Sequence, residues 1–171
     1  MVQAFYGPVS TLCFTLLGLW WVAVQIRGGE LFANAEWRRT VYGISVYFML
    51  PGLMSLLALV SPGVSALWRV AFVLAGLLGA TESALALRST RFMAGRSSRM
   101  TAARWATIAL YVLIALVGAA PEVASDLADL PPLLVEGILV SLMIVLGANL
   151  AWMALVHAAE SRTPLPPSSA G

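Results

Sequence analysis

The stretch LRSTRFMAGRSSRMTAARW, residues 87–105, holds five arginines and no acidic residue. Long apolar segments flank it, residues 65–87 on one side and 101–120 on the other. A short basic stretch between two apolar segments of about 20 residues is typical of a loop that joins two membrane-spanning helices, because such loops are retained on the cytoplasmic side. The arginines therefore predict a membrane location and also the side on which this loop lies.

The composition of the whole chain supports a membrane location. Of its 171 residues, 60% are hydrophobic and only 11% are charged, and the mean hydropathy is +0.89. Soluble domains are typically about 45–50% apolar and about 25% charged. Too few polar residues are present to cover a water-soluble domain, so we expect the lipid bilayer to be the first partner of this chain and a bacterial plasma membrane to be its location.

Five segments are long and apolar enough to cross a bilayer core of about 30 Å, which takes about 20 residues of helix. They are residues 9–26, 40–60, 65–87, 101–120 and 133–157. Apolar runs of this length without alternating polarity predict helices, not barrel strands. We therefore predict an all-α, polytopic fold, with one transmembrane domain of five helices over residues 1–160 and a flexible Pro/Ser-rich tail over 161–171.

The arginines alternate between the loops of this predicted bundle. From the first loop to the C-terminal tail they number three, none, five, none and one. The positive-inside rule then places the N-terminus outside and the C-terminus inside. The third loop becomes a cytoplasmic basic loop that contains Arg88, Arg91, Arg96, Arg99 and Arg104. Clustered arginines also attract anionic lipid headgroups, but no DNA-binding motif accompanies them, so we expect no nucleic-acid partner.

A few polar residues fall at membrane depth, where such residues mark a site by default. Glu82 in the third span, Asn149 in the fifth, and Ser45 and Tyr47 in the second all lie in the cytoplasmic half of their predicted helices. We take these four residues as a candidate polar intramembrane cluster for an ion, a polar head or a proton. The alternative is that they only hold helices together through hydrogen bonds.

A second pair of residues suggests a structural contact. Arg69 and Glu136 each lie about four residues into their predicted helices from the outer surface. Equal depth and opposite charge predict a structural ion pair between the third and fifth spans. His157 and Glu160 are only two potential ligands at the far end of the fifth span, which is too few for a metal site. We predict no metal and no cofactor.

Small residues recur at intervals of four in the third span, at Ala75, Gly79 and Ser83, and the fifth span adds Gly147 and Ala151. Stripes of this kind allow two helix backbones to approach closely, either within one chain or between chains.

These features favour a small non-enzymatic membrane protein, either an accessory or structural subunit of a membrane complex or a homo-oligomer. Its partners would be other membrane subunits or copies of itself. The alternative is a small channel or transporter for an ion, a proton or a small polar solute, which would use the cluster around Glu82. A third hypothesis is an intramembrane enzyme that acts on lipid or quinone, but no catalytic residues are predicted because no nucleophile motif or paired catalytic carboxylates occur.

Overall fold

The computed structural model describes residues 2–27, 35–60, 65–90 and 98–160, and the regular elements within these ranges are all α-helices. In chain order they are α1 (Val2–Ile26), α3 (Ala35–Val60), α4 (Ser65–Thr90), α5 (Ser98–Ala119), α6 (Pro121–Ala128) and α7 (Pro132–Glu160).

Every helix except α6 contains a stretch that is long and apolar enough to cross a membrane. These stretches are Ala4–Ile26, Trp37–Val60, Ala66–Leu85, Ala102–Ala119 and Pro132–Val156. The prediction of an all-α fold with five such helices is confirmed. The helices extend past the predicted spans, and α1 begins at Val2 although its span was predicted from residue 9. A helix continues as long as its backbone hydrogen bonds do, whereas a span was predicted only from its apolar residues.

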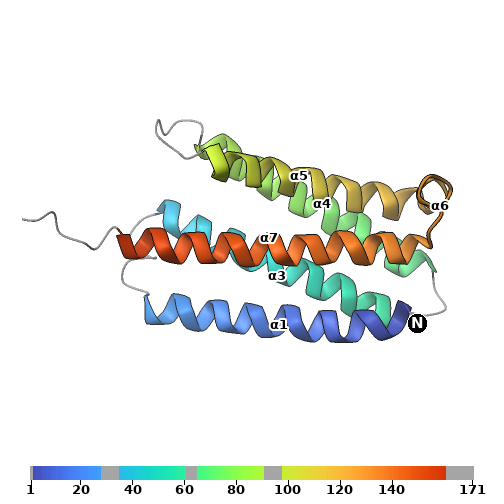
Figure 1. The fold of residues 1–171 in the computed structure, drawn as a ribbon, viewed down its shortest axis with the longest axis horizontal. Helices are drawn as coiled ribbons and strands as arrows, with labels where there is room; N and C mark the ends of the chain where they lie inside the picture. The colour runs from blue at the N-terminus through green and yellow to red at the C-terminus, as the bar shows by residue number, and fades with distance from the viewer. Residues whose placement is uncertain (1, 28–34, 61–64, 91–97, 161–171) are drawn as a thin grey trace, which may run out of the picture.

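The helices form an antiparallel bundle in which neighbours in sequence are also neighbours in space (Figure 1). Helix α1 packs on α3, α3 on α4, and α4 on α5. Helix α7 closes the bundle through contacts with α1, α3 and α5, whereas α4 packs mainly on α3 and α5. This order determines which polar side chains can meet.

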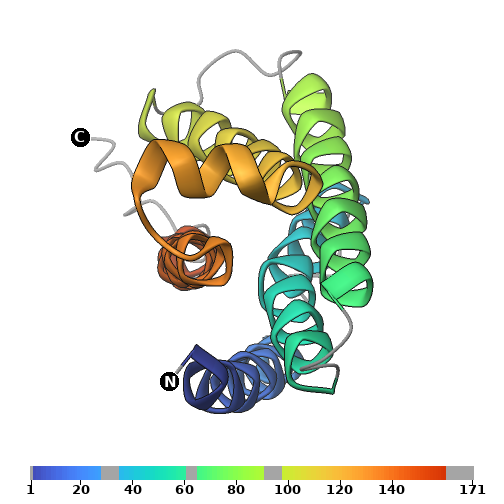
Figure 2. The ribbon, with the colours of Figure 1, turned by 90° about the vertical axis from the view of Figure 1, so that its right-hand side faces the viewer.

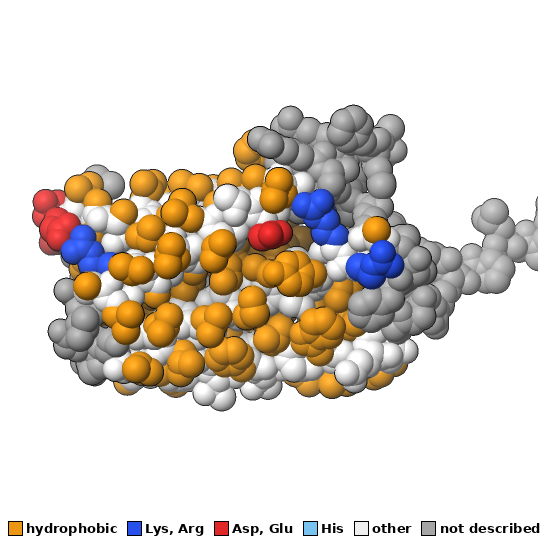
Figure 3. All heavy atoms as spheres, turned by 180° about the vertical axis from the view of Figure 1, so that it is seen from behind, with side chains coloured by type: hydrophobic (Ala, Val, Ile, Leu, Met, Phe, Trp, Pro, Cys, Tyr) orange, Lys and Arg blue, Asp and Glu red, His pale blue; other side chains and the backbone are white. Residues whose placement is uncertain are grey.

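The two ends of the bundle differ in charge. At one end, which we call the α6 end, helix α6 lies across the bundle (Figure 2), and the exposed acidic residues there are Glu122, Asp126 and Asp129. The opposite end, which we call the arginine end, carries Arg27, Arg38, Arg39 and Arg104. Between the two ends the surface is largely hydrophobic (Figure 3).

Helix α6 was not among the predicted elements. Pro121 occupies the first turn of α6, where the backbone N–H that proline lacks would have no partner within the helix. Glu122 follows in the same turn, where its negative charge interacts favourably with the helix dipole. The helix ends at Asp129, which adopts a left-handed conformation with φ 53° and donates its backbone N–H to the Ser125 carbonyl. These signals are local, and a search for spans of about 20 apolar residues does not find an eight-residue helix.

Glycines allow the closest helix contacts. A Cβ atom at Gly76 would lie 2.7 Å from the Tyr111 carbonyl oxygen, and one at Gly79 would overlap the Tyr111 ring, so both glycines bring α4 onto α5. At Gly147 of α7 a Cβ atom would lie 2.9 Å from that of Tyr47 on α3. The sequence left open whether Gly79 and Gly147 bring helices together within one chain or between chains. In the structure both glycines pack against helices of their own chain.

Candidate functional site

The structure does not bring the four residues of the predicted polar cluster together. The Glu82 side chain is exposed. Asn149 is also exposed, and its Nδ2 donates to the Val145 carbonyl of its own helix at 2.8 Å. The buried Ser45 hydroxyl likewise donates within its own helix, to the Val41 carbonyl at 3.1 Å. Equal depth placed these residues in one layer of the membrane, but Glu82 and Asn149 are exposed, whereas Ser45 is buried.

Tyr47 instead belongs to a different set of polar residues between α3, α4 and α5. Its hydroxyl donates to Thr107 Oγ1 at 3.0 Å, and the Thr107 hydroxyl donates to the Ala103 carbonyl at 2.9 Å. Tyr47 also interacts with the buried Ser83, the residue next to Glu82, and with the charge of Arg104. We call Tyr47, Ser83, Arg104 and Thr107 the Tyr47 cluster. Because its hydroxyls bond to one another and to the backbone, this cluster joins three helices.

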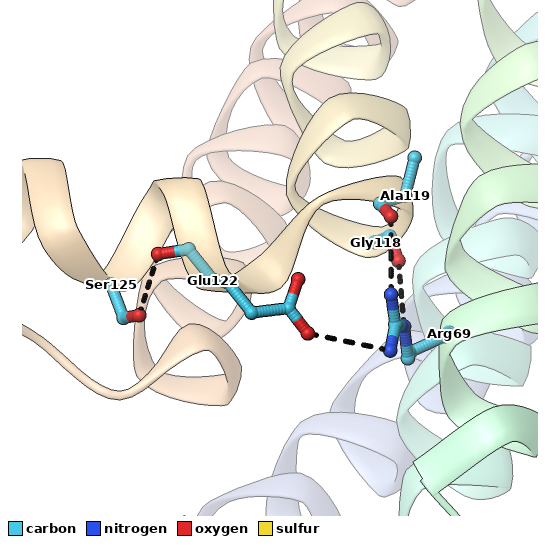
Figure 4. A network of polar contacts seen from close by, with 5 residues as sticks. All are labelled: Arg69, Gly118, Ala119, Glu122 and Ser125. Atoms are coloured by element: carbon cyan, nitrogen blue, oxygen red, sulfur yellow. Dashed lines mark hydrogen bonds and ion pairs between the residues drawn. The ribbon is translucent and has the colours of Figure 1, made fainter.

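Arg69 does not pair with Glu136 as the sequence predicted. Its Nη1 lies 3.7 Å from Glu122 Oε1, its Nε donates to the Gly118 carbonyl at 3.4 Å, and its Nη2 donates to the Ala119 carbonyl at 3.2 Å (Figure 4). Arg69 thus links α4 to the last turn of α5 and to the first turn of α6. A cation at the carbonyl end of a helix is favourable. The prediction was wrong because equal depth does not make α4 and α7 neighbours.

Glu136 occupies an unusual position. Its side chain is 0% exposed, and neither carboxylate oxygen has a hydrogen-bond partner. The phenol of Tyr6 on α1 donates to the Leu133 carbonyl at 2.6 Å, one helical turn before Glu136. The Tyr6 ring also contacts Phe72 of α4 edge to face, with ring centroids 6.4 Å apart. Glu136 therefore lies in the interior of the bundle close to its α6 end, in a region where aromatic side chains from α1 and α4 meet α7.

A third polar residue lies at the same depth. Ser55 on α3 is 0% exposed, and its hydroxyl has no hydrogen-bond partner. Tyr6 lies four residues after the start of α1, Glu136 lies four residues after the start of α7, and Ser55 lies five residues before the end of α3. At a rise of 1.5 Å per residue, each of the three lies about 6–8 Å from that end of its own helix which is on the α6 side of the bundle. We call Tyr6, Ser55 and Glu136 the α6-end site.

Sequence reasoning identified one of these three residues and gave it the wrong partner. The sequence offered only part of the signal, because Ser55 and Glu136 lie at similar depth in two predicted spans, whereas Tyr6 precedes the span that was predicted from residue 9. Within the described side chains, no three His, Cys, Asp or Glu residues lie close enough to hold a metal ion.

Only Arg104 of the predicted basic loop has a described side chain. Arg91 and Arg96 lie outside the described residues, as does the predicted tail over 161–171. Arg88 and Arg99 lie on the ends of α4 and α5, but their side chains are outside the described part.

Fold and composition together define a helical bundle whose five long helices suit a membrane-integral protein. Comparison with protein-family models, with curated proteins and with solved structures finds no match for this chain.

Proposed function

We propose that this chain is a non-enzymatic subunit of an assembly within the plasma membrane, with its N-terminus outside and its C-terminus inside. The assembly consists of copies of this chain or of this chain with another membrane protein. Helix α1 supplies the contact surface. The outward face of α1 is the observation that carries the proposal.

Small residues line that face over the part of α1 between Ala4 and Gly18, and the last two turns of the helix expose larger side chains such as Val22 and Ile26. The small residues follow at intervals of three and four, which places them on one side of the helix: Ala4, Gly7, Thr11, Thr15 and Gly18. The opposite side of α1 is the one buried against the bundle, through residues such as Cys13 and Val24. No other described side chain or backbone atom comes within 4 Å of a Cβ atom built at Gly18.

The two threonines are suited to a surface without water. Thr11 Oγ1 donates to the Gly7 carbonyl at 3.2 Å, and Thr15 Oγ1 donates to the Thr11 carbonyl at 2.8 Å. Both hydroxyls therefore donate their hydrogen bonds within α1, and the two short side chains project little from the helix. Such surfaces permit close approach of a second helix, which is favourable because helix association in membranes depends on van der Waals packing.

The lipid-facing surfaces of other helices are different. Helix α4 exposes Leu74, Leu77 and Leu78. Large aliphatic side chains are well matched to lipid tails, which are equally apolar. Helix α1 also exposes large side chains, such as Leu12 and Leu19, beside its small residues. The face between Ala4 and Gly18 is therefore the part of α1 that fits protein better than lipid.

The charge difference between the two ends supports the proposed orientation. Four described arginines lie at the arginine end and three exposed carboxylates at the α6 end, and the positive-inside rule places the arginine end in the cytoplasm. The channel or transporter hypothesis relied on a cluster of Glu82, Asn149, Tyr47 and Ser45, and the geometry of those residues does not favour it.

Substitution of Gly18 by leucine tests the proposal. A Cβ atom at position 18 has no described atom within 4 Å outside the neighbouring turns of its own helix, and leucine raises helix propensity, so we expect the fold to be retained. Association should weaken by about tenfold or more, which corresponds to a loss of about 1.4 kcal/mol of packing. The matched control is Ala109→Leu, which enlarges an exposed small residue on α5. The measurement is the mass of the purified detergent complex and of any copurifying protein.

We expect wild type and Ala109→Leu to form the same assembly, and Gly18→Leu to shift toward the monomer. A wild-type protein that is monomeric and free of partners at all concentrations would contradict the proposal. So would equal assembly of Gly18→Leu and wild type.

A further inference from the structure

The carboxylate of Glu136 has no compensating group from its own chain within the described structure. Neither oxygen accepts a hydrogen bond, and the side chain is fully buried. A buried carboxylate without a donor or a counter-charge is strongly destabilising, and removal of one partner from a buried ion pair shows the same effect. A positive charge must therefore come from another source.

The cations among the described side chains do not supply it. On α4, Arg69 is the cation nearest the α6 end, and it is held by Glu122 and by the carbonyls at the end of α5. Four other described arginines lie at the opposite, arginine end of the bundle: Arg27, Arg38, Arg39 and Arg104. The remaining charged residue of α4 with a described side chain, Glu82, is an exposed carboxylate. Helix α6 contributes only carboxylates, at Glu122, Asp126 and Asp129. On α1, the Tyr6 proton is already directed to the Leu133 carbonyl.

We propose that Glu136 binds one monovalent cation from solution, a proton or Na⁺, at the α6-end site between α1, α3 and α7. A single carboxylate balances a single positive charge. The Ser55 hydroxyl on α3 is also buried without a hydrogen-bond partner, at a similar distance from the end of its own helix. The Tyr6 phenol oxygen donates its one proton to Leu133 and keeps its lone pairs, so it supplies a further oxygen. Oxygen groups of this kind suit hard cations.

The α6 end is the side from which the cation enters. Glu136 lies one helical turn from the start of α7, about 6 Å along the helix axis, whereas the arginine end is much farther away. The three exposed carboxylates of α6 lie at this end. A surface of one sign of charge raises the local concentration of ions of the opposite sign.

Binding of a cation to the folded state alone stabilises that state by mass action. For a proton, stability is highest at acidic pH. It falls as pH rises from the range in which the unfolded carboxyl loses its proton to the range in which the folded carboxyl does, and is then constant. For Na⁺, stability rises with Na⁺ concentration at fixed pH. A hundredfold excess of ligand over its dissociation constant should raise Tm by about 5 °C or more.

The test measures Tm of the full-length protein in detergent. One series varies pH without Na⁺, at constant ionic strength kept with choline chloride. The other series adds Na⁺ at alkaline pH. Wild type is compared with Glu136→Gln, which removes the charge and keeps the shape. Glu82→Gln, which changes an exposed carboxylate near the arginine end, is the matched control.

A Tm that falls with rising pH in wild type and in Glu82→Gln, but not in Glu136→Gln, supports a proton. A rise in Tm with Na⁺ that only Glu136→Gln loses supports Na⁺. Equal responses of Glu136→Gln and wild type in both series overturn the proposal.

A second measurement on wild-type protein covers the case in which Glu136→Gln does not fold. A hydrophobic carbodiimide modifies protonated carboxyl groups, and mass spectrometry of the peptide that contains Glu136 reports the modification. Modification that decreases with rising pH supports a proton, and protection by Na⁺ supports Na⁺. A peptide that stays unmodified at every pH, together with a wild-type Tm that depends on neither cation, overturns the proposal.

Discussion

Gly79→Leu is expected to destabilise the bundle more than any other single substitution discussed for this chain, by more than about 3 kcal/mol. Even a Cβ atom at this position would overlap the Tyr111 ring, and a leucine adds three further carbons. Tyr111 cannot move aside easily, because its side chain is 1% exposed and is enclosed by neighbouring helices. The extensive contact between α4 and α5 would have to separate to accommodate the new side chain.

Unfolding of the purified protein by a denaturing detergent measures this loss. Gly18→Leu is the matched control, since it introduces the same side chain where no described atom lies within 4 Å of the added Cβ. A smaller side chain at position 111 should make room for a side chain at position 79. The double variant Gly79→Ala/Tyr111→Leu should therefore lose less stability than the sum of the losses of the two single variants. Equal stability of Gly79→Leu and Gly18→Leu would mean that α4 and α5 do not pack as described.

Phe72→Ala is the second substitution with a large expected effect, a loss of about 2 kcal/mol or more. Phe72 is fully buried, and its ring contacts Tyr6 and Trp68 edge to face. Its Cβ would also lie 3.2 Å from a Cβ atom at Gly118 of α5, so the site is closely packed. In soluble proteins a truncation of this kind costs about 3–5 kcal/mol. We expect a smaller loss of stability here. When helices separate in a membrane, the side chain moves into lipid and not into water, so its truncation removes packing contacts but no hydrophobic transfer energy.

Leu74→Ala on the same helix provides the control, because Leu74 is 54% exposed and faces away from the core. The same unfolding assay should place Leu74→Ala close to wild type and Phe72→Ala well below it. If both variants lose the same stability, the helix must be rotated relative to the structure.

The number of long helices could be predicted from the sequence because each is a long apolar run bounded by glycine, proline or arginine. Which face of each helix points into the bundle could not be predicted from the sequence. In a soluble helix the apolar stripe marks the buried side, but a helix that is apolar all round carries no such mark. Glu82 and Ser83 are adjacent in sequence, and only the structure determines that Ser83 faces the bundle and Glu82 does not.

Which helices are neighbours could not be predicted from the sequence either. Depth can be calculated by counting residues from a helix end, and it placed Arg69 and Glu136 in one layer. Which helices are neighbours within that layer depends on how the bundle closes, and α4 packs mainly on α3 and α5. The same counting puts Tyr6, Ser55 and Glu136 at similar depth in three helices that do contact one another, since α7 contacts both α1 and α3.

Both proposals rely on the α6 end lying outside the membrane and the arginine end inside, and thiol labelling in intact cells tests this claim most directly. Asp126 on α6 and Ala35 at the start of α3 are exposed and lie at opposite ends of the bundle. Each is replaced by cysteine in a chain that lacks the buried Cys13. A membrane-impermeant thiol reagent should modify Asp126→Cys in intact cells and Ala35→Cys only after permeabilisation. Modification of Ala35→Cys but not of Asp126→Cys in intact cells would contradict the orientation, and equal modification of both would contradict the membrane-spanning bundle itself.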